Sequence, residues 1–269
     1  MKKLLFTIAL CAASVLKTSA QCPLTNTAFN AGEVLRYQLY FNWQFVWIKA
    51  GTASLEIKDA TYKGTPCMKA SLITKGSPRT DKFFMMRDTL TSYFTSNLEP
   101  LYYRKGAREG KTFYTDEAWY THHANAVDVH QLYSKEGGTP RTNDHSSAEC
   151  VFDMVSMLMR ARSFDPSAYK EGQRIKFLMA DNGRVKSETL VFRGRKKYKM
   201  ESTGVTYRCL VFSFIERKNK KDKGVVTFYI TDDKNHIPVR LDLFLRFGTA
   251  KAFLNSHTTP RNPQTSIVK

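Results

Sequence analysis

The feature that most constrains this chain is an alternation of apolar and polar side chains that repeats along most of its 269 residues. Near its start, Leu35, Tyr37 and Leu39 share one side of an extended chain, and the residues between them share the other. This period of two predicts strands with one buried face, and therefore an all-β fold. The expected strands are residues 34–41, 52–57, 66–74, 82–86, 89–94, 101–105, 111–114, 117–121, 126–133, 175–179, 185–193, 196–201, 206–216, 225–231, 238–247 and 249–254, and residues 43–47 continue an aromatic-rich segment after the first of them.

One segment departs from this pattern. Val151, Val155 and Leu158 recur at three- and four-residue spacing, which predicts a helix near residues 148–162. Ser146 or Ser147 is expected to cap its start. The polar residues 137–147 before it, which begin with two glycines and a proline, are expected to form an exposed loop.

The first twenty residues are typical of a secretory signal peptide. Lys2 and Lys3 precede a short apolar stretch, and small residues before Ala20 predict cleavage after it. We therefore expect a periplasmic or secreted protein, with an outer-membrane lipoprotein acylated on Cys22 as the less favoured alternative. No later stretch has the roughly 20 apolar residues of a transmembrane helix, so no membrane span is expected in the mature chain.

The charge of the chain is strongly basic. Removing residues 1–20 takes away three lysines and lowers the formal charge from +18 to +15. After export, the anionic partners available are anionic lipid, lipopolysaccharide or acidic polysaccharide, and nucleic acid is not expected. The densest basic runs, residues 193–199 and 217–223, lie between expected strands and are interpreted as solvated hairpin tips.

The two strand-rich stretches carry similar landmarks in the same order. Each has a glycine before a strand, a second glycine and strand, a strand with a cysteine, an acid before a turn, and then a proline. This order suggests two halves, 32–135 and 172–255, joined by the helix at 148–162, although any antiparallel meander repeats strand and turn. The expected organisation is a signal peptide (1–20), an N-terminal segment (21–31), one β domain (32–255) and a flexible tail (256–269).

Four cysteines remain after cleavage, and four allow three pairings. Cys67 and Cys209 would occupy equivalent strands of the two halves, so we predict that a disulfide links these two in preference to the others. No pair of cysteines has the spacing of a metal site, and no metal is expected.

Several of these landmarks resemble a family of exported, Bacteroides-like periplasmic proteins of unknown function. Its opening strand with Gly32 and Glu33, its central helix with Asp153, Ser156 and Arg162, and its closing strand with Asp232, Asp233 and Pro238 occur here in order. The family usually has tryptophan where Tyr229 stands. The resemblance implies a strongly twisted all-β envelope protein, and it brings no catalytic residues with it.

Residues that could support catalysis do not form a recognisable set. Asp232 and Asp233 with His236 are interpreted as a hairpin turn whose carboxylates bond nearby backbone. Ser156 lies inside the expected helix, without the glycine-flanked elbow of a hydrolase, and Asp153 is expected to pair with a basic side chain. His122 and His123 are adjacent on a strand, so they point to opposite faces and cannot share one metal ion. No catalytic residue, cofactor or metal is therefore predicted.

An aromatic segment near the start is the one candidate ligand-binding face. Tyr37, Tyr40, Trp43 and Trp47 could stack on sugars or wrap an apolar tail, or they could pack a long hairpin. Together with the charge, this segment favours a non-catalytic envelope protein that binds an anionic or amphipathic component. The alternative is a structural role in envelope assembly that involves a protein partner, and a hydrolase is the third possibility. The fold expected for these functions is one all-β domain of large, strongly twisted antiparallel sheets.

Overall fold

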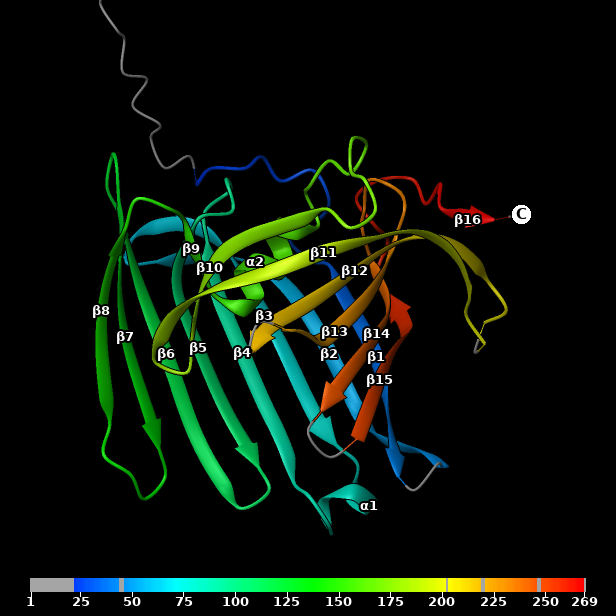
Figure 1. The fold of residues 1–269 in the computed structure, drawn as a ribbon, viewed down its shortest axis with the longest axis horizontal. Coiled ribbons are helices and arrows are strands. Elements are labelled where there is room, and N and C mark those ends of the chain that lie inside the picture. The colour runs from blue at the N-terminus through cyan, green and yellow to red at the C-terminus, as the bar shows by residue number, and fades with distance from the viewer. Residues whose placement is uncertain (1–21, 44–45, 202, 219–220, 246–247, 269) are drawn as a thin grey trace, which may run out of the picture.

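The computed structural model describes residues 22–268 except 44–45, 202, 219–220 and 246–247 (Figure 1). The predicted signal peptide lies outside the described residues. The strands of the first half are β1 to β8, at Val34–Trp43, Val46–Tyr62, Thr65–Gly76, Met86–Phe94, Pro100–Glu109, Thr112–His122, Val127–Lys135 and Arg141–Ser147. Those of the second half are β9 to β16, at Val151–Phe152, Arg174–Asp181, Arg184–Lys199, Thr206–Lys218, Lys221–Thr231, Pro238–Leu245, Gly248–His257 and Ile267–Val268. Two helices, α1 at Pro78–Asp81 and α2 at Met154–Ala161, complete the described elements.

All of these strands belong to one sheet, which confirms the all-β prediction. Its order is β8-β7-β6-β5-β4-β3-β2-β1-β15-β14-β13-β12-β11-β10-β9, with β16 added beside β12. Every pair is antiparallel except β9 with β10. The sheet therefore consists of two meanders joined through β1 and β15, and Figure 1 shows it curling around α2.

The turn between β10 and β11 reaches across to the other half of the sheet. Asp116 of β6 accepts hydrogen bonds from the backbone N–H groups of Asn182, at 2.6 Å, and Gly183, at 3.1 Å. These contacts join strands that lie near opposite edges of the sheet. The result is a nearly closed, barrel-like body rather than an open sheet.

Helix α2 lies inside the curled sheet, where it contacts β3, β4 and β10. Val155 and Met159 are fully buried there, beside sheet residues such as Leu55, Phe94 and Tyr103. The inner face of the sheet and the apolar side of the helix therefore form the core, as amphipathic elements require.

The helix begins later than the sequence predicted. Val151 and Phe152 pair with β10 as the short strand β9, and Asp153 rather than a serine caps α2. Ser146 and Ser147 belong to β8 instead. The prediction failed because two adjacent apolar residues fit a strand as well as a helix. Only the pairing of Val151 and Phe152 with β10 decides between the two structures.

Three other local predictions were wrong. Residues 141–147 form strand β8 instead of a loop, because they pair with β7 along their length. The basic residues 193–199 lie within β11, past a bulge, and not at a hairpin tip. Residues 82–86 are mostly a turn, because Ser77 caps α1 and Pro78 starts it, so β4 begins only at Met86.

The C-terminal segment was expected to be flexible, but it packs on the body. β15 continues to His257, and Ile267 pairs with Tyr207 of β12. Backbone hydrogen bonds such as Arg208 N–H to Ser266 O, at 2.8 Å, hold the segment between them. Alternation could not predict this packing, because a two-residue strand carries no period.

The two halves remain similar in order after folding. Gly32 and Gly172 precede the first strands of the two meanders with φ of +91° and +85°. Gly64 and Gly204 precede the strands that carry the cysteines, with φ of +82° and +71°. These matched left-handed positions agree with a duplicated unit, which stays a prediction.

Candidate functional site

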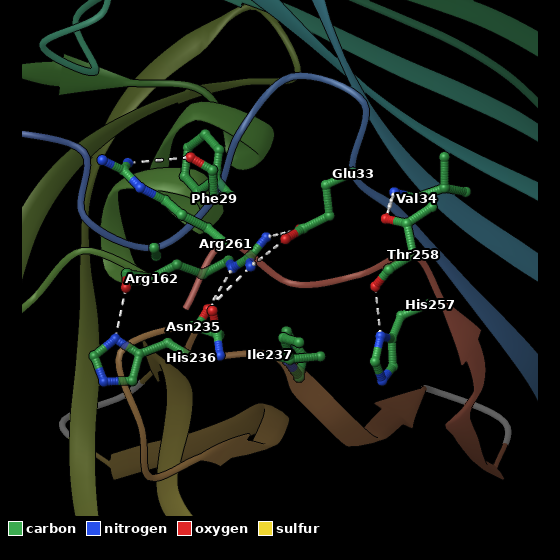
Figure 2. A network of polar contacts seen from close by, with 12 residues as sticks. Phe29, Glu33, Val34, Arg162, Asn235, His236, Ile237, His257, Thr258 and Arg261 are labelled. Atoms are coloured by element: carbon green, nitrogen blue, oxygen red, sulfur yellow. Dashed lines mark hydrogen bonds and ion pairs between the residues drawn. The ribbon is translucent and has the colours of Figure 1, made fainter. Parts of the chain in front are cut away.

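The residues that the sequence motifs singled out meet at one end of α2. Arg162, at the C-terminal end of the helix, forms a two-pronged ion pair with the carboxylate of Glu33, with Nη2 at 3.1 Å from Oε2. Its Nε and Nη2 also donate to the carbonyl oxygen of Asn235, at 3.3 and 2.9 Å. Figure 2 shows this guanidinium between the start of β1 and the loop between β13 and β14.

The same cluster is closed on its other sides. The ring of Phe29 lies 5.1 Å from the Arg162 guanidinium carbon, and His236 Nδ1 donates to the carbonyl oxygen of Arg162 at 2.5 Å. The side chains of Arg162 and Glu33 are 0% and 4% exposed. Burial lowers the pKa of His236. A charged pair this deeply buried has no exposed face for a ligand, so its role is to join three distant segments of the chain.

Asp233 organises the loop beside this ion pair. Its Oδ1 accepts from the Thr231 hydroxyl and the Asn235 N–H, both at 3.0 Å, and its Oδ2 accepts from the Ser266 hydroxyl at 2.6 Å. The prediction that this acid bonds local backbone is confirmed, because the Asn235 contact is such a bond. Asn235 in turn exchanges hydrogen bonds with Asn262, which ties the C-terminal segment to the cluster.

The two remaining motif positions of this loop are also structural. Asp232 forms an ion pair with Arg195 at 3.4 Å. The carbonyl oxygen of Pro238 accepts from the Tyr37 hydroxyl at 3.0 Å in the core. Neither contact leaves an acid–base pair facing a cavity.

Asp153 and Ser156 form the N-terminal cap of α2. The Asp153 carboxylate accepts from the N–H groups of Val155 and Ser156, and the Ser156 hydroxyl accepts from the Asp153 N–H. The second carboxylate oxygen accepts from the Ser92 hydroxyl at 2.9 Å, which anchors the helix to β4. Burial raises the pKa of Asp153 to about 6. The expected pairing of Asp153 with a basic side chain was wrong, because backbone N–H groups already satisfy it.

The predicted aromatic ligand face does not exist as one surface. Tyr37 is only 6% exposed and lies in the core, whereas Tyr40 packs edge-on against Phe253. Positions three apart on a strand point to opposite faces, which the prediction of one shared face ignored. Trp47 is 39% exposed, and the side chain of Trp43 lies outside the described part of the chain.

The disulfide prediction was also wrong. Cys22 is bonded to Cys150, with their Cα atoms 5.4 Å apart, and Cys67 and Cys209 are buried free thiols. Cys67 lies on β3 and Cys209 on β12, and five strands separate these two in the sheet. Equivalent strands of two meanders are not neighbours, and a disulfide needs Cα atoms within about 7 Å. Because the Cys22 sulfur is bonded to Cys150, a lipid thioether on it would require this disulfide to be absent.

The histidines bind separate partners. His122 lies 2.7 Å from the Pro100 carbonyl oxygen, and His123 lies 2.9 Å from Asp128. Within the described residues, no three histidine, cysteine or acidic side chains are grouped so that they could hold a metal ion.

A surface that sequence reasoning missed lies at one end of the sheet. Eleven large apolar side chains are exposed among the described residues, and eight of them belong to neighbouring turns or strand ends at this end. We call these eight the apolar rim: Val46, Trp47, Phe83, Phe84, Met85, Phe113, Phe244 and Leu245. Phe83 is the most exposed, at 88%, and Val46 follows at 62%.

The antiparallel topology brings these turns together. The last residues of β1, β3, β5 and β14 and the first residues of β2, β4, β6 and β15 all lie at the end marked by α1 at the lower edge of Figure 1. The Gly110 N–H of the β5–β6 turn donates to the Met85 carbonyl oxygen at 2.8 Å. The Lys251 ammonium lies 4.1 Å from the centre of the Trp47 ring. The sequence signal for this surface was Phe83 to Met86, which was interpreted as a strand.

Basic side chains surround the apolar rim. Lys49, Arg79, Lys82 and Lys111 are exposed on the same turns or the adjoining strand ends. The acids of this end are engaged, with Asp81 paired to Arg87 and Glu136 to Arg108. The surface is therefore apolar at its centre and positive at its margin.

Within the described residues, neither helix is long and apolar enough to cross a membrane. A family model described as "Protein of unknown function (DUF3108)" matches residues 36–255. No curated protein matches the chain. Among solved structures the chain is similar to "Crystal Structure of Beta-barrel-like Protein of Domain of Unknown Function DUF1849 from Brucella abortus", with a TM-score of 0.53, 7% identity, and coverage of 84% of this chain and 96% of that one. At this identity the likeness shows a shared fold alone.

Proposed function

The chain belongs to the DUF3108 family of proteins of unknown function, and we propose that it is a non-catalytic envelope protein that docks on an anionic lipid surface. The proposal places it on the periplasmic side of the envelope, as its N-terminal residues predict. Glu33 and Asp233 of the family motifs, and His236 next to them, form buried structural contacts. This supports a non-catalytic role.

The apolar rim carries this proposal. Soluble proteins rarely leave neighbouring large apolar side chains in water without a partner. Phe83 and Met85 are exposed on a turn beside α1, where the short helix and the Gly110 contact hold the turn in place. A tip of this shape can enter the boundary between lipid headgroups and acyl chains with little rearrangement.

The basic side chains at the margin of the apolar rim give the protein a preference for anionic lipid. Each lysine or arginine close to an anionic leaflet contributes about 1 kcal/mol, and the effect falls off within a Debye length. Burying one phenylalanine contributes about 1.5–3 kcal/mol. Three or four cations and two or three inserted side chains together favour reversible, salt-sensitive docking.

Co-sedimentation with lipid vesicles tests the proposal. The wild-type protein should bind vesicles that contain equal parts phosphatidylglycerol and phosphatidylcholine, and it should bind pure phosphatidylcholine much more weakly. Phe83→Asp should reduce binding roughly tenfold or more, because it removes an apolar contact and adds an acid near anionic lipid. Ile267→Asp is the matched control, since Ile267 is 38% exposed and lies on β16, away from the apolar rim.

Two outcomes would overturn the proposal. One is the absence of binding to anionic vesicles at low salt. The other is an equal loss of binding in Phe83→Asp and Ile267→Asp, since that would place the contact elsewhere. The alternative of a protein partner in envelope assembly would gain if Phe83→Asp left vesicle binding intact while abolishing capture of one stoichiometric protein.

A further inference from the structure

A row of aromatic rings crosses the outer face of the first meander, at the end opposite the apolar rim. Tyr93, Tyr102, Trp119 and His130 stand on β4, β5, β6 and β7. Their chain neighbours Phe94, Tyr103 and Val129 are buried in the core, so the ring residues face outward. Tyr62, the last residue of β2, stacks on Tyr102 with ring centres 5.4 Å apart and planes 4° apart.

The rings of this aromatic row are direct cross-strand partners. Tyr93 pairs with Tyr102, Tyr102 with Trp119, and Trp119 with His130 in the strand register. The corresponding ring centres are 6.0, 5.5 and 5.5 Å apart. Lys69 of β3 and Asp144 of β8 continue the row at its two ends. With these two residues included, the row crosses six strands and is about 24 Å long at a spacing of about 4.8 Å, and its four aromatic positions span about 14 Å.

Hydrogen bonds hold two of these rings in place from their edges, and the other rings pack against them. The Tyr102 hydroxyl donates to Glu117, which also lies 3.8 Å from the Arg104 guanidinium. The His130 ring bonds Asp144 at 2.6 Å. The row is therefore fixed before any ligand arrives, which lowers the entropy cost of binding.

A hollow of about 410 Å³ opens beside Trp119. Carboxylates, imidazoles and hydroxyls form most of its wall, which consists of Trp119, Thr121, Asp128, Val129, His130, Asp144, His145 and Ser146. Each carboxylate has about four acceptor positions, so Asp128 and Asp144 keep capacity beyond their histidine partners. The hollow thus combines a flat ring with several groups that can bond hydroxyls.

We propose that the aromatic row binds an oligosaccharide of β-linked hexoses. Hexoses whose substituents are equatorial present flat C–H faces that stack on aromatic rings, and their edges carry the hydroxyls that Asp128 and Asp144 can accept. An extended, β-linked chain is long enough to span a row of this length. This site goes beyond lipid docking, because it lies at the other end of the sheet and takes another class of ligand.

Isothermal titration calorimetry with cellohexaose and chitohexaose tests this site, and maltohexaose serves as the curved, α-linked comparison. The wild-type protein should bind a β-linked hexaose and show weaker or no binding of maltohexaose. Trp119→Ala should weaken binding roughly tenfold or more, as loss of a central aromatic contact does. Asp144→Asn is the second variant, because the Asp144 side chain is 81% exposed and its replacement leaves the fold intact, and it should weaken binding several-fold.

Trp47→Ala is the matched control, since Trp47 belongs to the apolar rim, and it should bind the hexaose like the wild type. Phe83→Asp should also keep hexaose binding, which separates this site from the lipid proposal. The inference is overturned if neither β-linked hexaose binds, if maltohexaose binds equally well, or if Trp47→Ala loses as much affinity as Trp119→Ala and Asp144→Asn.

Discussion

Replacing Arg162 with methionine tests whether the buried ion pair joins the fold together. Arg162→Met removes the guanidinium and leaves the carboxylate of Glu33 buried with no positive partner. It also removes both hydrogen bonds to the Asn235 carbonyl oxygen. Methionine fills a similar volume, so the change acts mainly on charge and hydrogen bonding.

The expected cost follows from the burial of both side chains. They are 0% and 4% exposed, and removing one partner of such a pair typically costs about 3–5 kcal/mol. A domain of this size loses about 2–4 °C in melting temperature per kcal/mol, so Arg162→Met should lower it by roughly 10 °C. The double variant Glu33→Leu with Arg162→Met should recover much of this loss, because no unpaired charge remains.

Denaturant unfolding with the disulfide intact measures these changes. Arg174→Met is the matched control, because Arg174 and Asp222 form an ion pair whose side chains are 38% and 39% exposed. An exposed pair contributes about 0–1 kcal/mol, so this control should unfold close to the wild type. The reasoning is refuted if Arg162→Met lowers the free energy of unfolding no more than Arg174→Met does. It is also refuted if the loss in the double variant equals the sum of the losses in Glu33→Leu and Arg162→Met.

Two further predictions concern the disulfide and one buried acid. Cys22→Ser with Cys150→Ser opens a link across 128 residues, and chain entropy predicts a loss of about 5 kcal/mol, measured by unfolding under oxidising conditions; a loss below about 1 kcal/mol would contradict this. Burial, with the nearby charge of Asp181, raises the pKa of Asp116 from 3.8 to about 6, so its contribution to stability is largest below pH 4 and is lost as the pH rises through about 6. Asp116→Asn, which does not titrate, should therefore gain stability relative to the wild type as the pH rises from about 4 to about 6, by up to about 3 kcal/mol, and a constant difference across that range would contradict the assignment.

Part of the candidate site could be predicted from the sequence. Glu33, Arg162 and Asp233 were singled out by their motifs, and they do lie together in the structure. Their role was not predictable, because an ion pair between residues 129 positions apart depends on where two strands and a helix meet. The sequence also showed Phe83 to Met86 as an apolar run, but its exposure depends on the turn that Ser77 and Pro78 impose.

The aromatic row shows the same division. Tyr93, Tyr102 and Trp119 each fit the outward side of an alternating strand, so their direction was readable from the sequence. Their adjacency depends on the register between β4, β5 and β6, and a shift of one residue would break the row. Register is set by turns and by the packing of the inner face, neither of which is encoded in any single strand.

The sequence by itself determined that this chain folds as many strands with one connecting helix, because periodicity is a local property that each segment carries alone. The tertiary structure decided which strands are neighbours, and with them the Cys22–Cys150 bond, the buried Arg162 and the two surfaces proposed to bind ligands. The physical reason is that these features arise between segments distant in the chain. They depend on how one sheet curls and closes, and that closure is fixed by the packing of the whole molecule.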